Sequence, residues 1–333
     1  MKIPLPFLTI KNAWAYYLLK WGWISKATLR FRTQPDSLSV DLDRHLQRQA
    51  RRTVKDLCKL IRCGEFEYHQ EDHAMVIYSL RKVQQHRAPF NLLRIESIRY
   101  FLEHDIAFKD SEEGPLFEIA IKGFRFLARK DIPGDAFVLG ETFLDGEYDF
   151  LRPYLAGAAV LDIGAYIGDT AVLFAHYGAR TIVAFEPHPE LYQLAKKNIA
   201  LNRLESQVIL RHEGVAGKDG ELRIREDSDA GASAAFGLYE SDRGKTIGLR
   251  LVSINKIIAE LGTIDVLKMD CEGAEFEIFE ALPENELKKI KAIGLEYHRD
   301  PKLIIAKLEN AGFVVKVVPD PESNQGLLFA VLK

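Results

Sequence analysis

Cysteine is scarce in this 333-residue chain, and long apolar runs are missing. The three cysteines, Cys58, Cys63 and Cys271, are an odd and sparse set without a C-x-x-C spacing, which excludes a disulfide scaffold and argues against a structural zinc site. Lys11 and Lys20 interrupt the apolar N-terminal stretch, whereas a membrane-spanning helix needs about 20 apolar residues. No small-residue cleavage site follows. These absences predict a cytoplasmic protein without a transmembrane segment.

Tryptophan is equally rare, and its three copies lie together at Trp14, Trp21 and Trp23. A helix there would place Trp14 and Trp21 on one face with Tyr17 and Leu18. We expect this face to pack against the chain itself or against a second copy, as in a homodimer. Peripheral contact with a membrane surface through an interfacial helix is the alternative.

Basic residues gather in the first third of the chain. Residues 1–112 hold 19 Lys and Arg against 13 Asp and Glu, whereas the remainder holds 26 against 35. Helical periodicity over 37–62 and 73–109, after a short strand at 27–33, predicts a mainly helical N-terminal region. The basic face over 37–62 suits contact with nucleic-acid phosphates, although a simply solvated face shows the same pattern.

The composition, 47% apolar and 28% charged, is that of a globular protein and excludes disorder. Length and a change of pattern near residue 150 predict more than one domain. The segments are a basic, mostly helical N-terminal domain over 1–112, a β-hairpin connector over 113–150 and an α/β domain over 151–333. The hairpin is expected from the alternation of apolar and polar residues over 115–139, where Gly123 and Pro133 mark turns.

Buried strands and amphipathic helices alternate from about residue 150 onward. Strands are expected at 158–164, 181–186, 207–212, 220–225, 247–252, 264–270, 290–298, 313–318 and 326–332. Helices are expected at 169–177, 189–201, 253–261, 274–282 and 301–311. This order predicts a seven-stranded, mostly parallel sheet with helices on both faces and a last antiparallel hairpin. Ligands bind such sheets at the carboxyl ends of the strands.

The loop after the first of these strands runs from Asp162 through Gly164, Ala165 and Gly168 to Asp169. Glycines allow a tight turn and the close approach of a ligand. The third glycine of a dinucleotide loop is missing, and the two aspartates would repel a pyrophosphate. The loop therefore favours S-adenosylmethionine (SAM), which has a cationic end and no phosphate, over NAD.

Carboxylates also follow the second and fourth strands. Glu186 ends the second strand, where a carboxylate accepts hydrogen bonds from both ribose hydroxyls of an adenosine-type cofactor. Asp270 and Glu272 follow the fourth strand and are expected to face the cleft, whereas Glu275 is expected only to cap the next helix. His298 ends the fifth strand and is a candidate general base.

Four motifs appear in a fixed order: D-x-G-A-x-x-G-D, F-E-P, K-x-D-x-E-G-A-E and E-x-H. On these motifs, residues 147–216 and 249–298 resemble the FkbM family of SAM-dependent methyltransferases. The resemblance implies the class I methyltransferase fold, which is Rossmann-like, and methylation of hydroxyls on sugars or secondary metabolites.

The same resemblance implies roles for individual residues. Those expected to bind SAM are Asp162, Gly164, Ala165, Gly168 and Asp169 at the methionine part, Glu186 at the ribose, Pro187 and His188 along the adenosine, and Asp270. Asp270 and Glu272 would also face the methyl-transfer site.

We predict in-line methyl transfer to a hydroxyl of a glycan or small molecule, with His298 as general base oriented by Asp270 or Glu272. No metal ion is expected, although the carboxylates could instead bind a divalent cation that lowers the pKa of the hydroxyl. The alternative function is RNA methylation, with the basic N-terminal domain binding phosphates. A non-enzymatic scaffold and an NAD-dependent oxidoreductase are weaker alternatives. The small-residue loop 227–246 is expected to form a mobile flap over the acceptor site.

Overall fold

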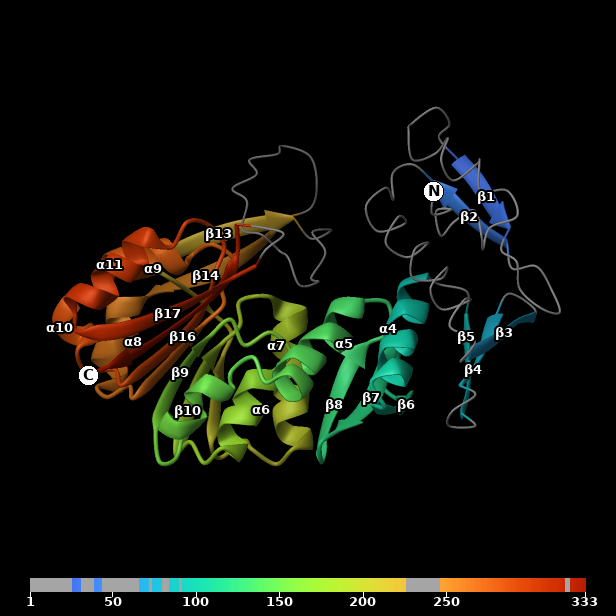
Figure 1. Cartoon of the computed structure of the whole chain (residues 1–333), viewed down its shortest axis with the longest axis horizontal. Coiled ribbons are helices and arrows are strands. Elements are labelled where there is room, and N and C mark those ends of the chain that lie inside the picture. The colour runs from blue at the N-terminus through green and yellow to red at the C-terminus, as the bar shows by residue number, and fades with distance from the viewer. Residues whose placement is uncertain are drawn as a thin grey trace, which may run out of the picture. The chain divides into compact units, whose positions relative to one another are not determined.

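The structure is a computed structural model, shown in Figure 1. It describes residues 26–30, 39–43, 66–71, 74–79, 84–89, 92–225, 246–320 and 324–333. The chain divides into two compact units, residues 1–108 with 129–133 and residues 109–128 with 134–333. The predicted N-terminal aromatic face, with its homodimer or membrane contact, lies outside the described residues, and so does nearly all of the predicted flap.

The described part of the N-terminal unit is mainly strand. Its elements are β1 Lys26–Arg30, β2 Ser39–Asp43, β3 Phe66–Glu71, β4 Ala74–Ser79, β5 Gln84–Pro89 and α4 Leu92–Glu103. β1 pairs antiparallel with β2, and β4 lies between β3 and β5 in a second antiparallel sheet.

The expectation of a mainly helical N-terminal region is therefore wrong over β2, β4 and β5. The sequence of β4, Ala-Met-Val-Ile-Tyr-Ser, contains β-branched and aromatic residues that suit a pleated surface. The sequence of β2, Ser-Val-Asp-Leu-Asp, alternates with the period of a strand. The strand expected at 27–33 is confirmed over Lys26–Arg30, and a helix within 73–109 is confirmed only by α4.

The predicted hairpin is present, but its second half differs. The strands are β6 Ala107–Asp110, β7 Leu116–Ile121 and β8 Phe124–Arg129, in the order β6–β7–β8. Lys122 and Gly123 join β7 to β8 with φ values of 46° and 89°, as a two-residue hairpin turn requires. The next residues form helix α5, Pro133–Gly140, instead of a strand. Pro133 is its first residue, where the fixed φ of proline favours a helix.

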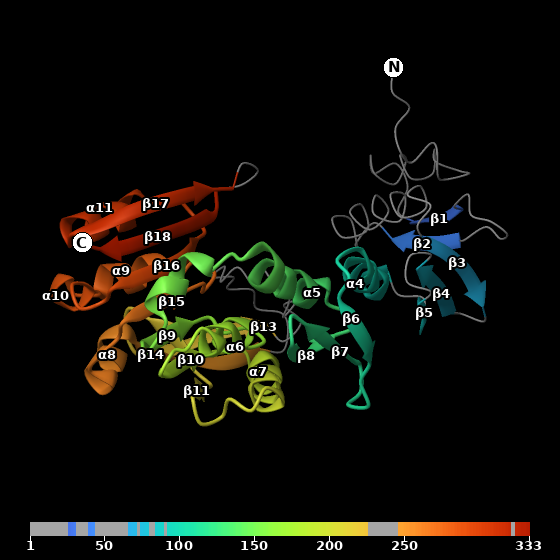
Figure 2. The ribbon, with the colours of Figure 1, turned by 60° about the horizontal axis from the view of Figure 1, so that its bottom comes forward.

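The main sheet has the predicted seven strands in the order β11–β10–β9–β15–β16–β18–β17. They are β9 Ala159–Ile163, β10 Thr181–Phe185, β11 Val208–Arg211, β15 Val266–Met269, β16 Ala292–Tyr297, β17 Phe313–Pro319 and β18 Gly326–Leu332. Figure 2 shows β11 at one end of this row and β17 at the other. Within this sheet, β18 alone runs opposite to the other six strands. The predicted α/β fold, a seven-stranded and mostly parallel sheet that ends in an antiparallel hairpin, is confirmed.

Helices follow the strands as expected. They are α6 Asp169–His176, α7 Pro189–Leu201, α8 Ile254–Leu261, α9 Glu275–Ala281, the additional α10 Glu284–Leu287, and α11 Lys302–Asn310. Apolar residues of α8, α9 and α11 share one buried core with alternate residues of β9, β10, β15, β16 and β18. A short turn of π-helix, Glu141–Asp145, and a 3-10 helix, Asp149–Tyr154, lead from α5 into β9.

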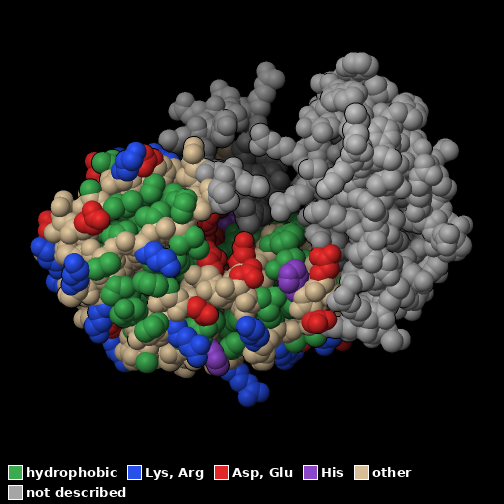
Figure 3. Space-filling view, in the orientation of Figure 1, with side chains coloured by type: hydrophobic (Ala, Val, Ile, Leu, Met, Phe, Trp, Pro, Cys, Tyr) green, Lys and Arg blue, Asp and Glu red, His purple; other side chains and the backbone are tan. Residues whose placement is uncertain are grey.

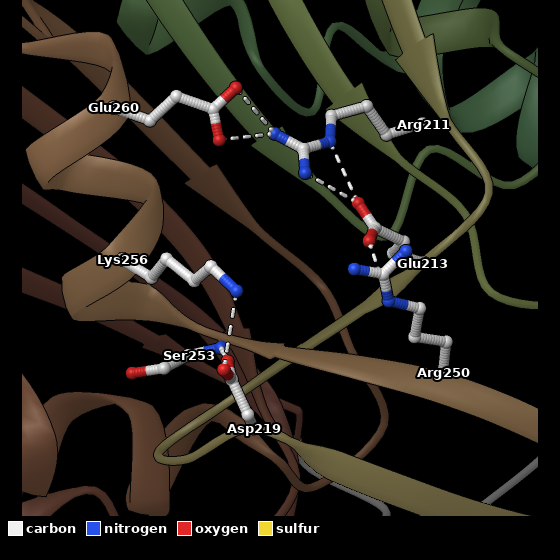
Figure 4. Close-up of polar contacts among 7 residues, drawn as sticks. All are labelled: Arg211, Glu213, Asp219, Arg250, Ser253, Lys256 and Glu260. Carbon is white, nitrogen blue, oxygen red and sulfur yellow. Dashed lines mark hydrogen bonds and ion pairs between the residues drawn. The ribbon is translucent and has the colours of Figure 1, made fainter.

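A small sheet, β12 Gly214–Ala216, β14 Thr246–Ser253 and β13 Gly220–Arg225, lies beside α8. Figure 4 shows the ion pairs that hold it there. Arg211 of β11 donates hydrogen bonds to Glu213, which directly precedes β12, and to Glu260 of α8. Arg250 of β14 lies 3.2 Å from Glu213. The strands expected at 220–225 and 247–252 are confirmed.

Two amide side chains, Asn198 of α7 and Asn202 directly after this helix, bond to the hairpin strand β8. Asn198 accepts the N–H of Leu127 at 2.7 Å and donates to the carbonyls of Leu127 at 3.1 Å and Ile167 at 2.8 Å. One turn later, Asn202 accepts the N–H of Arg125 at 3.1 Å and donates to its carbonyl at 2.7 Å. The hairpin is thus bonded directly to a helix of the α/β domain.

Candidate functional site

The strand register places four strand ends at one edge of the sheet. Ile163 pairs with Phe185 of β10 and with Met269 of β15, and Met269 pairs with Leu295 of β16. Because these strands are parallel, the segments that follow them meet at the same edge. The sequence-predicted residues of all four strand ends are therefore brought together.

The loop after β9 approaches the neighbouring strand closely. Gly164 has a φ of 82°, and a Cβ built on it would lie 1.7 Å from the carbonyl oxygen of Asp270. Only glycine fits this position without a shift of the backbone. Tyr166 has a φ of 48° despite its side chain. Its N–H donates to Glu186 at 2.9 Å, and its hydroxyl donates to Asp135 at 2.6 Å.

A buried ion pair between Asp162 and Lys268 stabilises the loop after β9. Asp162 is fully buried, accepts the hydroxyl of Thr170 at 2.7 Å and lies 3.3 Å from Nζ of Lys268. Lys268 also donates to the carbonyl of Gly164 at 2.6 Å. Burial alone would lower the pKa of Lys268, but the Asp162, Asp270 and Asp169 carboxylates outweigh it and raise the pKa above its ordinary value. Lys268 is therefore a charged support for the loop, a role the sequence did not indicate.

Glu186 lies at the end of β10 against the same loop. Its carboxylate is buried and accepts the N–H groups of Tyr166 at 2.9 Å and His188 at 2.8 Å. Burial raises the pKa of Glu186 to about 7, although both hydrogen bonds act in the opposite direction. Each carboxylate oxygen keeps a lone pair for a further donor. Pro187 and His188, the next residues, are half-buried and lead into α7.

Residues 135–148 contribute to the site, although no strand-end pattern marks them. Thr142 donates its hydroxyl to the buried Asp169 at 2.6 Å, and burial raises the pKa of Asp169 to about 7. Asp135 is fully buried and accepts the Tyr166 hydroxyl. The ring of Tyr148 lies 5.7 Å from Nζ of Lys268. This segment thus contacts the middle of the loop after β9, at Tyr166, and its end, at Asp169.

At the ends of β15 and β16, His298 lies between two carboxylates. Its Nδ1 is 3.2 Å from Oε1 of Glu275, and its Nε2 is 3.3 Å from Oε2 of Glu272. The same oxygen of Glu275 accepts the N–H groups of Cys271 and Gly273, each at 3.1 Å. The expectation that Glu275 only caps α9 is therefore wrong. The position of Glu275 close to the strand-end residues Asp270 and Glu272 was the feature of the sequence that could have indicated this role.

The carboxylates of this cluster perturb one another. Burial raises the pKa of both Glu272 and Glu296 to about 7, and the neighbouring Asp270 carboxylate adds to the effect. Burial also raises the pKa of Asp270. Burial alone would lower the pKa of His298, but Glu275, Glu272 and Glu296 raise it to about 9. Figure 3 shows acidic side chains gathered beside a hollow on the face it presents.

A metal ion would find ligands in this cluster. Among the described residues, Asp270, Glu296 and His298 offer ligand atoms that all lie within 4.8 Å of one another. Asp270 follows β15, Glu296 is in the neighbouring β16 and His298 directly follows β16, so the pairing of the two strands brings these residues together. The set of two carboxylates and an imidazole suits a divalent cation. Glu296 was not among the residues expected in the site.

Among the described residues, no helix combines the length and apolar character needed to span a membrane. Residues 162–315 match the sequence model of the Methyltransferase FkbM domain. Methyltransferase sdnD of Sordaria araneosa is 27% identical over 215 residues, covering 53% of this chain and 81% of that protein. Methyltransferase 1 of Beauveria bassiana is 26% identical over 209 residues, covering 54% of this chain and 82% of that protein. The crystal structure of methyltransferase FkbM from Methylobacillus flagellatus covers 53% of this chain and 43% of its own at 14% identity, with a TM-score of 0.38.

Proposed function

We propose that this chain, whose residues 162–315 match the Methyltransferase FkbM domain, is a methyltransferase that methylates a hydroxyl of a glycan or small metabolite with SAM. The main support for the proposal is that three features lie together at one edge of the sheet. They are a glycine loop, a buried carboxylate after β10 and a histidine that contacts carboxylates. The glycine loop suits close approach of a ligand, and the histidine suits proton removal from a hydroxyl.

The residues of the edge fit a cationic adenosine compound. SAM supplies an electrophilic methyl group on a positively charged sulfur. In this proposal Glu186 accepts the ribose hydroxyls with its remaining lone pairs, and Pro187 and His188 lie along the adenosine. The methionine part would lie along Gly164, Ala165 and Gly168, near the Asp162, Asp169 and Asp270 carboxylates.

The acceptor hydroxyl must lose its proton during transfer, and we assign this proton to Nε2 of His298. Asp270 and Glu272 would face the same point. The base must be neutral to accept a proton. Because the carboxylates raise the pKa of His298 to about 9, only a minority of the imidazole is neutral at pH 7. We therefore expect kcat/KM, which reports the free enzyme, to increase with pH up to about pH 9 and then to level off.

A divalent cation on Asp270, Glu296 and His298 is the competing route for proton removal, because a bound cation lowers the pKa of a hydroxyl. Dialysis against a chelator separates the two routes. Activity that survives dialysis supports His298 as the base. Activity that is lost and returns with Mg²⁺ or Mn²⁺ would replace the base with a metal.

The proposed function is tested with SAM labelled on its methyl group. The protein is incubated with extract from its source cells, and glycan, lipid, RNA, protein and small-molecule fractions are separated. Label in glycans or small molecules supports the proposal, provided that Glu186→Gln abolishes it and the exposed control Glu205→Gln does not. Label in RNA would instead assign phosphate binding to the basic N-terminal region. Absence of label from every fraction would contradict the proposal.

A further inference from the structure

The two carboxylates that contact His298 differ in their exposure to solvent. The side chain of Glu275, on Nδ1, is completely buried, whereas that of Glu272, on Nε2, is 25% exposed. The imidazole itself is 11% exposed. A ligand that enters from solvent therefore reaches Nε2 and Glu272 before it reaches Nδ1 and Glu275.

Glu275 is fixed by the start of α9. Its Oε1 accepts three N–H groups, from the backbone of Cys271 and Gly273 and from the ring of His298. These bonds hold the carboxylate charged: burial opposes ionisation, but the His298 and Gly273 hydrogen bonds outweigh it and keep the pKa of Glu275 below its ordinary value. Moving this side chain would leave buried N–H groups without partners, which is costly. The ring of His298 is therefore held with Nδ1 as the donor.

Glu272 is held far less firmly. In the described part of the chain, its carboxylate makes one polar contact, the 3.3 Å approach to Nε2 of His298. Its backbone has a φ of 55° and precedes Gly273, whose φ is 108°. From this left-handed turn the side chain reaches Nε2 of His298. When a ligand displaces this carboxylate from Nε2, one partly exposed ion contact is lost and one hydrogen bond to the ligand is gained.

We propose that Glu275 is a positioning residue that aims Nε2 of His298 at the acceptor, and that the acceptor hydroxyl displaces Glu272 from this nitrogen. The inference rests on the proposed function. Without acceptor, the imidazolium donates one N–H to each carboxylate. When Glu272 leaves, the proton on Nε2 passes to solvent and this nitrogen faces the acceptor hydroxyl.

Transfer then proceeds with a neutral imidazole. The bond from acceptor oxygen to methyl carbon forms as the bond from sulfur to methyl carbon breaks, and the hydroxyl proton moves to Nε2. The products are a methyl ether, neutral S-adenosylhomocysteine and an imidazolium on Glu275. Asp270, which follows β15, and Glu296 of β16 also lie close to His298.

Nitrogen NMR of ¹⁵N-histidine-labelled protein tests the positioning role without any need for activity. The His298 signals are assigned by their absence in His298→Gln. Above its titration, neutral His298 should carry its proton on Nδ1, and Glu275→Gln, which keeps an acceptor oxygen, should preserve that tautomer. Glu275→Ala should populate the Nε2–H tautomer, with circular dichroism confirming the fold. An Nε2–H tautomer in the unmodified protein would overturn the proposal, even if methyl transfer is detected.

The KM for acceptor tests the displacement of Glu272. If the acceptor must displace the charged carboxylate from Nε2, the KM for acceptor should decrease in Glu272→Gln, because a neutral amide holds the imidazole less firmly. The exposed control Glu277→Gln should leave this KM unchanged. A KM of Glu272→Gln equal to that of the unmodified protein would mean that the acceptor does not displace Glu272 and would refute the displacement.

Discussion

Replacing Gly164 with alanine tests whether the loop after β9 depends on the close approach of two backbones. At a φ of 82°, the new Cβ would lie 1.7 Å from the carbonyl oxygen of Asp270. That oxygen belongs to the chain just after β15, whose residues pair with β9. Neither backbone can move without disturbing the centre of the sheet, so the variant should be strongly destabilised.

Gly123 provides a matched control for the backbone strain. Its φ is 89°, and no atom lies within 4 Å of a Cβ built there. A left-handed backbone costs an alanine about 1–2 kcal/mol, and both variants share this term. Only Gly164→Ala adds the collision, which as overpacking costs about 1–3 kcal/mol more. The difference between the two variants therefore measures the steric contact alone.

Urea denaturation followed by circular dichroism measures this difference. We expect the free energy of unfolding to fall by at least about 1 kcal/mol more in Gly164→Ala than in Gly123→Ala, and SAM binding to be lost only in Gly164→Ala. Equal destabilisation of the two variants would show that the loop tolerates a side chain, and the account of its geometry would be wrong.

Three further outcomes are expected. Asn198→Ala should cost about 2–4 kcal/mol of unfolding free energy, because it strips buried groups of β8 of their partners, and Asn202→Ala, at an exposed strand end, should cost less in the same urea assay. His298→Gln should lower kcat by about 10²–10⁴-fold while calorimetry finds SAM affinity nearly unchanged; a large loss of affinity would contradict the assignment. Because burial raises the pKa of Glu186 to about 7, SAM affinity should increase as pH rises through this value and the carboxylate ionises, and a flat calorimetric profile would count against ribose binding there.

The pattern of residues 151–333 predicted the sheet because each part of it was locally determined. Parallel strands buried on both faces are short apolar runs, and the helices between them are amphipathic, so the two periods are easily separated. The same reasoning failed over residues 74–89. There, short strands of mixed polarity in a small antiparallel sheet carry apolar residues at spacings that also fit a helix.

The candidate site was predictable only where it depends on strand ends. Topology alone brings Glu186, Asp270 and His298 to one edge, because parallel strands present their carboxyl ends together. The contact of Glu275 with His298 depends on the turn at Gly273, whose left-handed backbone no periodicity reveals. The role of Thr142 depends on how a segment far from α6 in the sequence packs against it. Such contacts are decided by tertiary packing.

Isothermal titration calorimetry with SAM tests the central claim most directly. The account predicts saturable SAM binding to the unmodified chain, weakened severely by Glu186→Gln and unaffected by Glu205→Gln, with no binding of NAD. Binding of NAD in place of SAM, or SAM binding that is indifferent to Glu186→Gln, would contradict the assignment of this sheet edge to methyl transfer.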